Sequence, residues 1–88
     1  MKDKAVEVAH NKLCDINEAG YKVIRVEIEK TLENVVFYIF VDLTESGKRG
    51  FITINVSSRA AYNPSFQLYD FLLERLRKSV DMLIKKLS

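Results

Sequence analysis

The only histidine and the only cysteine of the chain lie close together near the start of the sequence. They belong to a series of polar side chains spaced four, three and four residues apart: Asp3, Glu7, His10 and Cys14. A helix would place these side chains along one stripe. A histidine and a cysteine four residues apart can share a metal ion, or the imidazole can activate the thiol. Because no second ligand pair stands at zinc spacing, we predict no metal site and interpret the stripe as the wet side of a helix, with Cys14 as a small, half-buried residue.

The glycines and carboxylates do not form a catalytic arrangement either. Residues 47–50 read Gly-Lys-Arg-Gly, without the upstream glycine and the downstream serine or threonine of a phosphate-binding P-loop. Glu27 and Glu29 share one face of an expected strand with Arg25 and solvent, whereas a catalytic carboxyl with a raised pKa needs an apolar pocket. We therefore expect neither catalytic residues nor a cofactor, and we expect that the protein is not an enzyme.

The length and composition fit one small globular domain spanning residues 1–88. Hydrophobic residues make up 48% and charged residues 30% of the chain, which excludes a disordered or collagen-like protein. The longest apolar run, residues 35–41, is far shorter than the roughly 20 residues that cross a bilayer. The net charge of +2 does not by itself indicate nucleic acid. We expect a cytoplasmic protein, because the sequence opens without a secretory signal and its single cysteine fits a reducing compartment.

The hydrophobic pattern first predicts a helix over residues 3–19. Apolar residues recur there at spacings of three, four and three and would form its buried face: Val6, Ala9, Leu13 and Ile16. Asp3 is the expected N-cap. Gly20 can adopt the left-handed conformation after the last turn, with Tyr21 packed back onto Ile16 as in a Schellman motif.

From residue 21 the apolar period changes from 3.6 to two residues, which predicts three strands. In the first, residues 21–29, apolar and charged side chains alternate. The second, residues 34–43, is apolar on both faces, so we expect it to be the central strand. The third, residues 51–57, alternates again after a turn that contains two glycines.

Asn63 and Pro64 are expected to start a long final helix, because asparagine caps helices well and proline is tolerated at the first helical position. Apolar residues recur through this helix in steps of three and four, as in heptads. A second apolar row flanks that seam: Leu68, Phe71, Leu72 and Met82. One sheet cannot bury so wide a sector. Either the first helix covers this row, or the row is an oligomer interface in a homodimer.

This order of elements predicts an α+β fold. It would be a two-layer sandwich of order α-β-β-β-α, with a three-stranded antiparallel meander and both helices on one face. The uniformly apolar row of the central strand would face the helices. The reverse facing, which would expose Phe37 and Ile39, stays open.

With the first facing, an apolar and aromatic surface lies on the uncovered side of the sheet. Val23 would join it, and monomers seldom expose a contiguous apolar patch of more than a few hundred Å². Residues 58–63 could instead fold over part of it. We interpret it as a partner-binding surface formed by Val36, Tyr38, Phe40, Phe51 and Arg25.

The element order resembles that of the double-stranded RNA-binding domain, which also has a helix, three strands and a helix, and the resemblance covers nearly the whole chain. That family carries a glycine-proline-histidine loop between its first two strands, where residues 30–34 here read Lys-Thr-Leu-Glu-Asn. It also opens its second helix with a lysine cluster, whereas residues 57–64 contain one basic residue, Arg59. Neither motif is present, so no RNA contact of the family is carried over.

A different nucleic-acid surface can be drawn from the aromatic side chains alone. Bases would stack on the rings of the uncovered face, and phosphates would bind Lys48, Arg49 and Arg59, with Arg25 also nearby. The acidic residues Glu27 and Glu29 share this neighbourhood and oppose phosphate binding.

The sequence therefore predicts a small non-enzymatic protein–protein interaction domain that forms a homodimer. By analogy, adaptors and inhibitors of the kind carried by phages and mobile elements also have this size and lack a catalytic site. The alternative is an RNA-binding or other nucleic-acid-binding domain.

Overall fold

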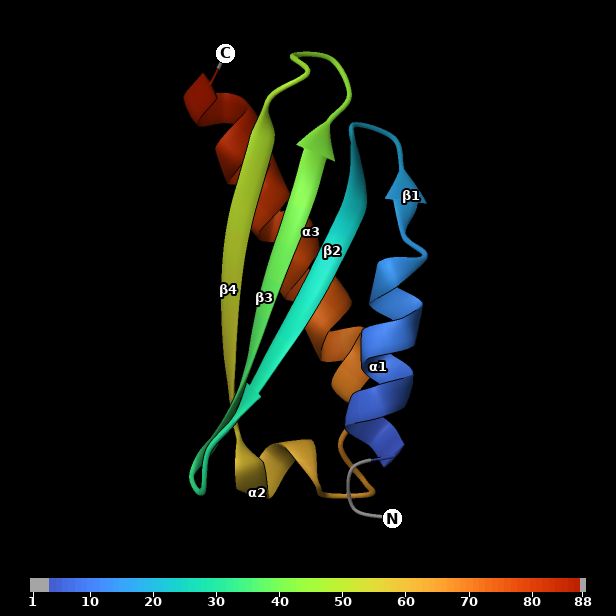
Figure 1. Ribbon diagram of the computed structural model, residues 1–88, viewed down its shortest axis with the longest axis vertical. Helices are drawn as coiled ribbons and strands as arrows, with labels where there is room; N and C mark the ends of the chain where they lie inside the picture. The colour runs from blue at the N-terminus through green and yellow to red at the C-terminus, as the bar shows by residue number, and fades with distance from the viewer. Residues whose placement is uncertain (1–3, 88) are drawn as a thin grey trace.

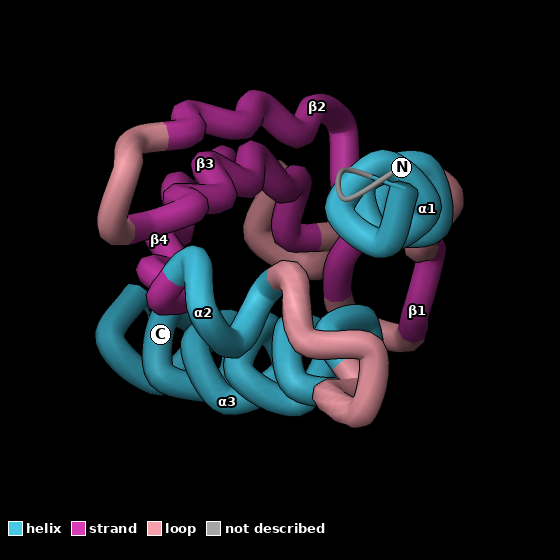
Figure 2. The backbone as a smooth tube through the Cα atoms, turned by 90° about the horizontal axis from the view of Figure 1, so that it is seen from below, coloured by secondary structure: helices cyan, strands magenta, loops and turns pink. Residues whose placement is uncertain are grey.

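The computed structural model describes residues 4–87 (Figure 1). Its elements are α1 (Lys4–Cys14), β1 (Asn17–Glu18), β2 (Tyr21–Lys30), β3 (Asn34–Leu43), β4 (Arg49–Ser57), α2 (Ser58–Ala61) and α3 (Leu68–Leu87). The strands form one antiparallel sheet in the order β1-β2-β3-β4. α1 and α3 lie on the same side of this sheet, and α2 closes the end at which β4 finishes (Figures 1 and 2).

This architecture confirms the α+β class and corrects the predicted order of elements. The sheet has a fourth strand, β1, which pairs with the start of β2, and a short helix, α2, precedes the long one. β1 has two residues and α2 has four, so neither is long enough to produce a hydrophobic period in the sequence.

β3 is the strand around which the core is built. Its residues alternate strictly between the two sides of the sheet. The inward side chains are buried together with those of α1 and α3: Val35, Phe37, Ile39, Val41 and Leu43. The facing predicted from the apolar row is therefore confirmed, and the reverse facing is wrong.

β2 contains a β-bulge that changes which of its residues face the core. Val23 pairs with Val41 and Arg25 pairs with Phe40, so Ile24 is an extra residue without a partner on β3. The inward positions switch from odd to even numbers at this point. Val23 is consequently buried, and its expected place on the uncovered side is wrong. Ile24 is exposed instead.

α1 ends at Cys14, well before the predicted end at residue 19. The carbonyl of Ile16 accepts a hydrogen bond from the N–H of Val23 (3.0 Å), so the chain has already joined the sheet at this point. Gly20 has a φ of +99°, but it serves the turn between β1 and β2 and not a Schellman motif. The expected N-cap, Asp3, lies outside the described residues.

The predicted helix start at Asn63 and Pro64 is wrong, because these residues form a turn between α2 and α3. The side-chain Oδ1 of Asn63 accepts a hydrogen bond from the N–H of Ser65 (2.9 Å), as in an Asx turn. The helix that does begin in this region is α2. Its N-cap is Ser57, whose Oγ accepts from the N–H of Ala60 (3.2 Å).

α3 buries one side along most of its length. The fully buried residues recur every four positions: Leu68, Leu72, Leu76 and Val80. Leu68 and Leu72 belong to the core cluster that α1 also joins, so they cannot serve as the oligomer interface predicted from the flanking row.

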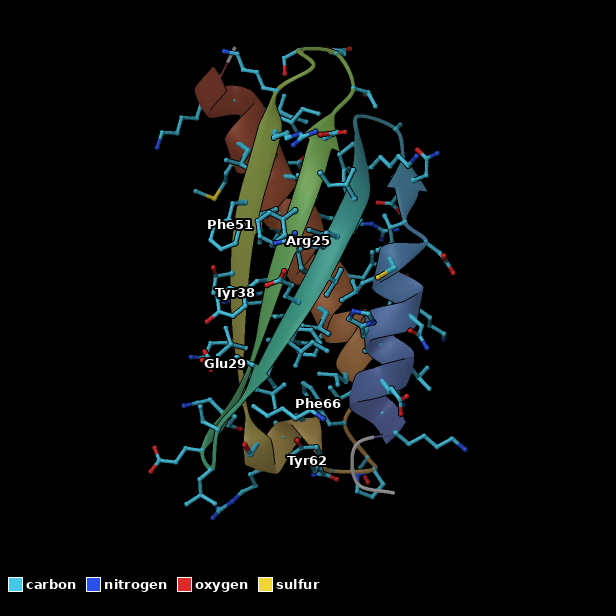
Figure 3. All side chains as sticks on the ribbon, viewed as in Figure 1. Arg25, Glu29, Tyr38, Phe51, Tyr62 and Phe66 are labelled. Carbon is cyan, nitrogen blue, oxygen red and sulfur yellow. The ribbon has the colours of Figure 1, made fainter. Side chains whose placement is uncertain are left out.

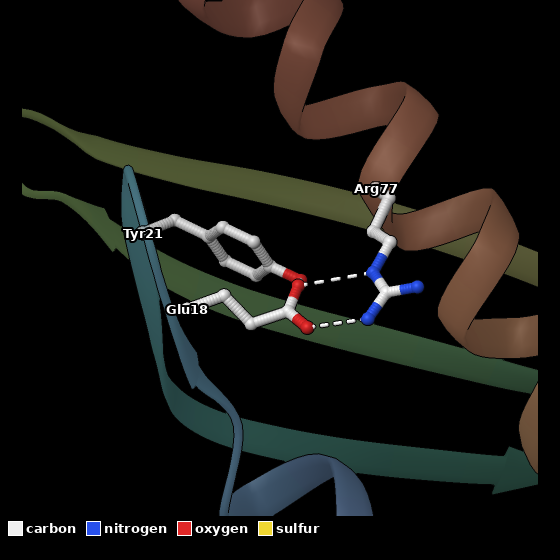
Figure 4. A network of polar contacts seen from close by, with 3 residues as sticks. All are labelled: Glu18, Tyr21 and Arg77. Atoms are coloured by element: carbon white, nitrogen blue, oxygen red, sulfur yellow. Dashed lines mark hydrogen bonds and ion pairs between the residues drawn. The ribbon is translucent and has the colours of Figure 1, made fainter.

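A polar clasp joins the β1–β2 hairpin to the middle of α3 (Figure 4). Arg77 donates from Nε to Oε1 of Glu18 (3.1 Å) and from Nη2 to Oε2 (2.5 Å), and the hydroxyl of Tyr21 also donates to Oε1 (2.6 Å). The bonds from Arg77 and then Tyr21 lower the pKa of Glu18 to about 2. Burial, followed by the contact with Glu18, raises the pKa of Tyr21. The clasp therefore requires a charged Glu18 and a neutral Tyr21.

We expect Leu72→Ala to lower the free energy of unfolding by about 2–5 kcal/mol, because it opens a cavity in the core. Met82 is 71% exposed. Met82→Ala should therefore change the free energy of unfolding by no more than about 0.5 kcal/mol. Urea denaturation followed by circular dichroism measures both values. Equal losses of unfolding free energy in Leu72→Ala and Met82→Ala would contradict the division of the flanking row into core and surface residues.

The clasp should also make stability depend on pH. The folded-state pKa of Glu18 lies below its ordinary value of 4.5, so the stabilisation is complete above about pH 4.5 and is lost as the pH falls towards 2. Arg77→Met should therefore be clearly less stable than the wild type at pH 6, and this difference should shrink at pH 2.5. Lys78→Met, which removes an exposed pair with Glu74, is the matched control with a smaller effect at pH 6. A difference for Arg77→Met that is the same at both pH values would contradict the clasp.

Candidate functional site

The uncovered side of the sheet carries a cluster of side chains that we call the open-face patch. It comprises Val36, Tyr38 and Phe40 of β3, Phe51 of β4 and Arg25 of β2. Figure 3 views this side of the sheet and labels three of them. Alternate residues of a strand point to opposite faces, so the burial of one row of β3 places the other row here. The structure brings together all the residues predicted for partner binding.

The aromatic rings of the open-face patch contact one another across β3 and β4. Phe40 lies directly opposite Phe51, with ring centroids 5.0 Å apart and planes tilted by 42°. Tyr38 stacks on Phe51 at 6.0 Å with an interplanar angle of 5°. The guanidinium carbon of Arg25 lies 4.6 Å from the ring centroid of Phe40, a cation–π distance. Each ring is held by a neighbour, although Phe51 is still 55% exposed.

Two carboxylates of β2 fix the polar groups of the open-face patch. The hydroxyl of Tyr38 donates to Oε1 of Glu29 (2.9 Å), and this hydrogen bond raises the pKa of Tyr38. Arg25 Nη2 lies 2.6 Å from Oε2 of Glu27. The patch thus has an apolar, aromatic centre with charged groups beside it, as in protein interfaces that have a hydrophobic core and a polar rim.

No element among residues 4–87 covers the open-face patch. Residues 58–63, the alternative cover, fold into α2 and the turn after it, at the end of the sheet (Figure 2). Ala61 is buried there, and Ala60 and Tyr62 pack against the core cluster. The segment closes the core and leaves the aromatic rings accessible.

The remaining members of the predicted oligomer row do not form a continuous surface. Phe71 is half-buried, with its ring 5.4 Å from that of Phe66 and the guanidinium of Arg75 5.6 Å from its centroid. Met82 is exposed, more than two turns further along α3. Because Leu68 and Leu72 are in the core, the row contributes only isolated residues to the surface.

The basic residues of the alternative nucleic-acid surface lie at opposite ends of the molecule. Lys48 is in the β3–β4 turn and Arg49 begins β4, whereas Arg59 is in α2 at the other end of the sheet (Figure 1). The described chain is 40 Å long in this direction. Nε of Arg49 also lies 3.4 Å from Oδ1 of Asp42. These residues therefore do not form one basic patch.

His10 joins α1 to β2, whereas Cys14, which was expected to be half-buried, is exposed. His10 Nε2 donates to the carbonyl of Val26 (2.9 Å), and Sγ of Cys14 lies 3.9 Å from the same nitrogen. Burial, followed by the charge of Asp15, raises the pKa of Cys14, which disfavours the reactive thiolate. Within residues 4–87 no group of three or more potential ligands is placed to hold a metal ion.

Sequence reasoning missed Ile24 as a neighbour of the open-face patch. Together with Arg25, Phe40 and Arg49 it surrounds a shallow depression. The sequence does contain a signal for the position of Ile24, because strict alternation cannot accommodate two consecutive apolar residues, Val23 and Ile24. The change from odd to even apolar positions in this strand indicates the bulge.

Comparisons with protein-family models, curated proteins and solved structures found no match to this chain. The geometry of the surface is therefore the basis on which a function can be proposed. No helix within residues 4–87 combines the length and the apolar character needed to cross a membrane.

Proposed function

We propose that this chain is a non-enzymatic protein–protein interaction domain, of adaptor or inhibitor type, that binds a protein partner through the open-face patch. The observation that carries the proposal is the aromatic cluster of Tyr38, Phe40 and Phe51, which is ordered by its own contacts; Phe51 is exposed, and Tyr38 and Phe40 are half-buried. A cytoplasmic location belongs to the proposal and agrees with the single unpaired cysteine.

The rings of the cluster are already fixed in position, and this favours binding. Association is opposed by the loss of side-chain freedom, and fixed side chains have less of it to lose. Tyr38 is held by Glu29 and by the ring of Phe51, and Phe40 lies between Arg25 and Phe51. These rings lose little additional entropy when a partner covers them. Aromatic residues and arginine are also the types that most often dominate the binding energy of protein interfaces.

The charged groups beside the aromatic rings indicate what the partner must supply. Glu27 and Glu29 lie beside the aromatic centre, so a partner with apolar groups at its centre and basic groups at its margin would match the patch. A homodimer remains part of the proposal. The second copy need not occupy the open-face patch, because the edge strand β4 offers it a different surface.

Nucleic-acid binding is the second candidate, and one observation favours it. Arg25 and Arg49 flank the ring of Phe40 around one shallow depression, where a base and a phosphate could both be bound. Against it, Arg25 is paired with Glu27 and Arg49 with Asp42, so a carboxylate beside each guanidinium opposes the binding of a phosphate.

The test compares three variants that keep the core intact. Phe51→Ser and Phe40→Asp alter the open-face patch, while Leu32→Ser removes an equally apolar side chain that is 95% exposed in the β2–β3 turn. Affinity-tagged proteins would be used to capture partners from cell extract, with and without nuclease, and the partners would be identified by mass spectrometry. Circular dichroism and urea denaturation establish that each variant is folded.

We expect the wild type and Leu32→Ser to retain the same protein partner. Phe51→Ser should weaken that binding at least about thirtyfold, as expected for the loss of a central aromatic anchor. Identical partners for all folded variants would refute the role of the open-face patch. Retention that disappears after nuclease treatment would favour the nucleic-acid candidate.

A further inference from the structure

The two edges of the sheet differ in how their backbone is protected. On the β2 side, β1 pairs with the start of β2, α1 packs alongside the strand, and His10 Nε2 donates to the edge carbonyl of Val26 (2.9 Å). The bulge at Ile24 and the charged residues of β2 add further protection. Short strands, bulges, charges and covering helices are the devices by which proteins prevent pairing at a sheet edge.

β4 forms the opposite edge, where α3 packs beside the strand but the strand itself carries only one charged residue, Arg49, at its start. It runs for nine residues, pairs with β3 without a register shift, and has no partner strand on its other side within residues 4–87. Residues 50–57 contain no charged side chain and no proline. An edge strand of this length and composition is a template for another strand.

The backbone groups at this edge can be assigned from the hydrogen bonds at the two ends of the β3–β4 ladder. The N–H of Leu43 donates to the carbonyl of Lys48, and the N–H of Ser58 donates to the carbonyl of Glu33 (both 2.8 Å). In an antiparallel ladder hydrogen-bonded and non-hydrogen-bonded pairs alternate, so the even-numbered residues of β4 bond to β3. The N–H and C=O groups that point outwards belong to Arg49, Phe51, Thr53, Asn55 and Ser57.

We propose that β4 of a second copy of this chain pairs with this edge, antiparallel and about a two-fold axis, and joins the two sheets into one. The register that pairs the whole strand places Thr53 opposite Thr53 of the second copy and Arg49 opposite Ser57. No like charges then face each other across the strands. The self-complementarity of this uncharged strand identifies a second copy as the occupant.

Apolar side chains on both sides of the edge add area to this pairing. Phe51, Met82 and Leu83 line a groove between β4 and α3. Phe51 and Met82 are 55% and 71% exposed, and the approach of a second β4 and α3 would cover them. A strand pair alone buries a narrow strip, and covering these side chains adds apolar area of the kind that stable interfaces bury.

The dimer interface and the open-face patch share Phe51, but dimer formation and partner binding can be tested separately. Val36, Tyr38 and Phe40 lie on β3, one strand away from the edge, and remain accessible in the paired form. Thr53 is not part of the open-face patch, so a Thr53 variant that fails to dimerise keeps all five residues of the patch and should still bind that partner.

The first experiment uses the wild-type protein in solution. Sedimentation velocity from about 1 µM to 1 mM should detect a shift from 10.2 kDa to twice this mass. Amide hydrogen exchange measured by NMR at both ends of this range should reveal protection at residues 51, 53 and 55 that appears only at high concentration. Residues 52 and 54 should be protected throughout, because they bond to β3.

The second experiment uses two substitutions at one position. Thr53→Pro removes an outward N–H that has no role in the β3–β4 ladder, and proline is tolerated at such edge positions. It should weaken the dimer at least about tenfold, while Thr53→Ala, which keeps the N–H and loses only the side-chain contact, should weaken it clearly less.

A protein that stays monomeric up to 1 mM would overturn the proposal. A dimer in which residues 51, 53 and 55 exchange as fast as in the monomer would also overturn it, because the copies would then meet through another surface. Equal dimerisation of Thr53→Pro and Thr53→Ala would overturn the proposal as well. If Thr53→Pro does not fold, the concentration dependence of exchange in the wild type decides.

Discussion

The structure depends on the burial of one row of side chains on β3. Phe37, Ile39 and their neighbours can leave water only if other elements cover that side of the sheet, and α1 and α3 do so. Within residues 4–87, α1 and α3 both lie on this face, and no helix covers the other. The aromatic row of β3 consequently stays in contact with solvent, and its rings are ordered by one another and by the carboxylates of β2. The core and the candidate binding surface are thus two results of one strand that is apolar on both sides.

The bulge at Ile24 makes this arrangement possible on β2. Tyr21 must point inwards for its hydroxyl to reach Glu18 in the clasp with Arg77, and Val23 follows it on the same side. Without an extra residue, the same parity would direct Arg25, Glu27 and Glu29 into the core, where unpaired charges cost far more than one irregular strand position. The bulge lets one strand supply an aromatic side chain to the interior at its start and charged side chains to the open face afterwards.

The sequence predicted what depends on long, regular patterns. The strict alternation of β3, the amphipathic face of α1 and the grouping of Val36, Tyr38, Phe40, Phe51 and Arg25 on one side all follow from periodicity over about ten residues. It could not predict features decided by a single tertiary contact. The end of α1 depends on a bond between Ile16 and Val23, and the start of α3 depends on a turn in which Asn63 uses its capping chemistry locally. The division of the flanking row into buried Leu72 and exposed Met82 depends on where α3 crosses the sheet.

The unequal edges of the sheet also determine how far an assembly of this chain can grow. Strand addition that propagates without limit, as in fibrils, requires each molecule to offer two open edges. Here α1, β1 and the His10 bond to Val26 protect one of them. Two copies that join through β4 would therefore leave only protected edges, and the long uncharged edge of one molecule would be used up in a closed pair.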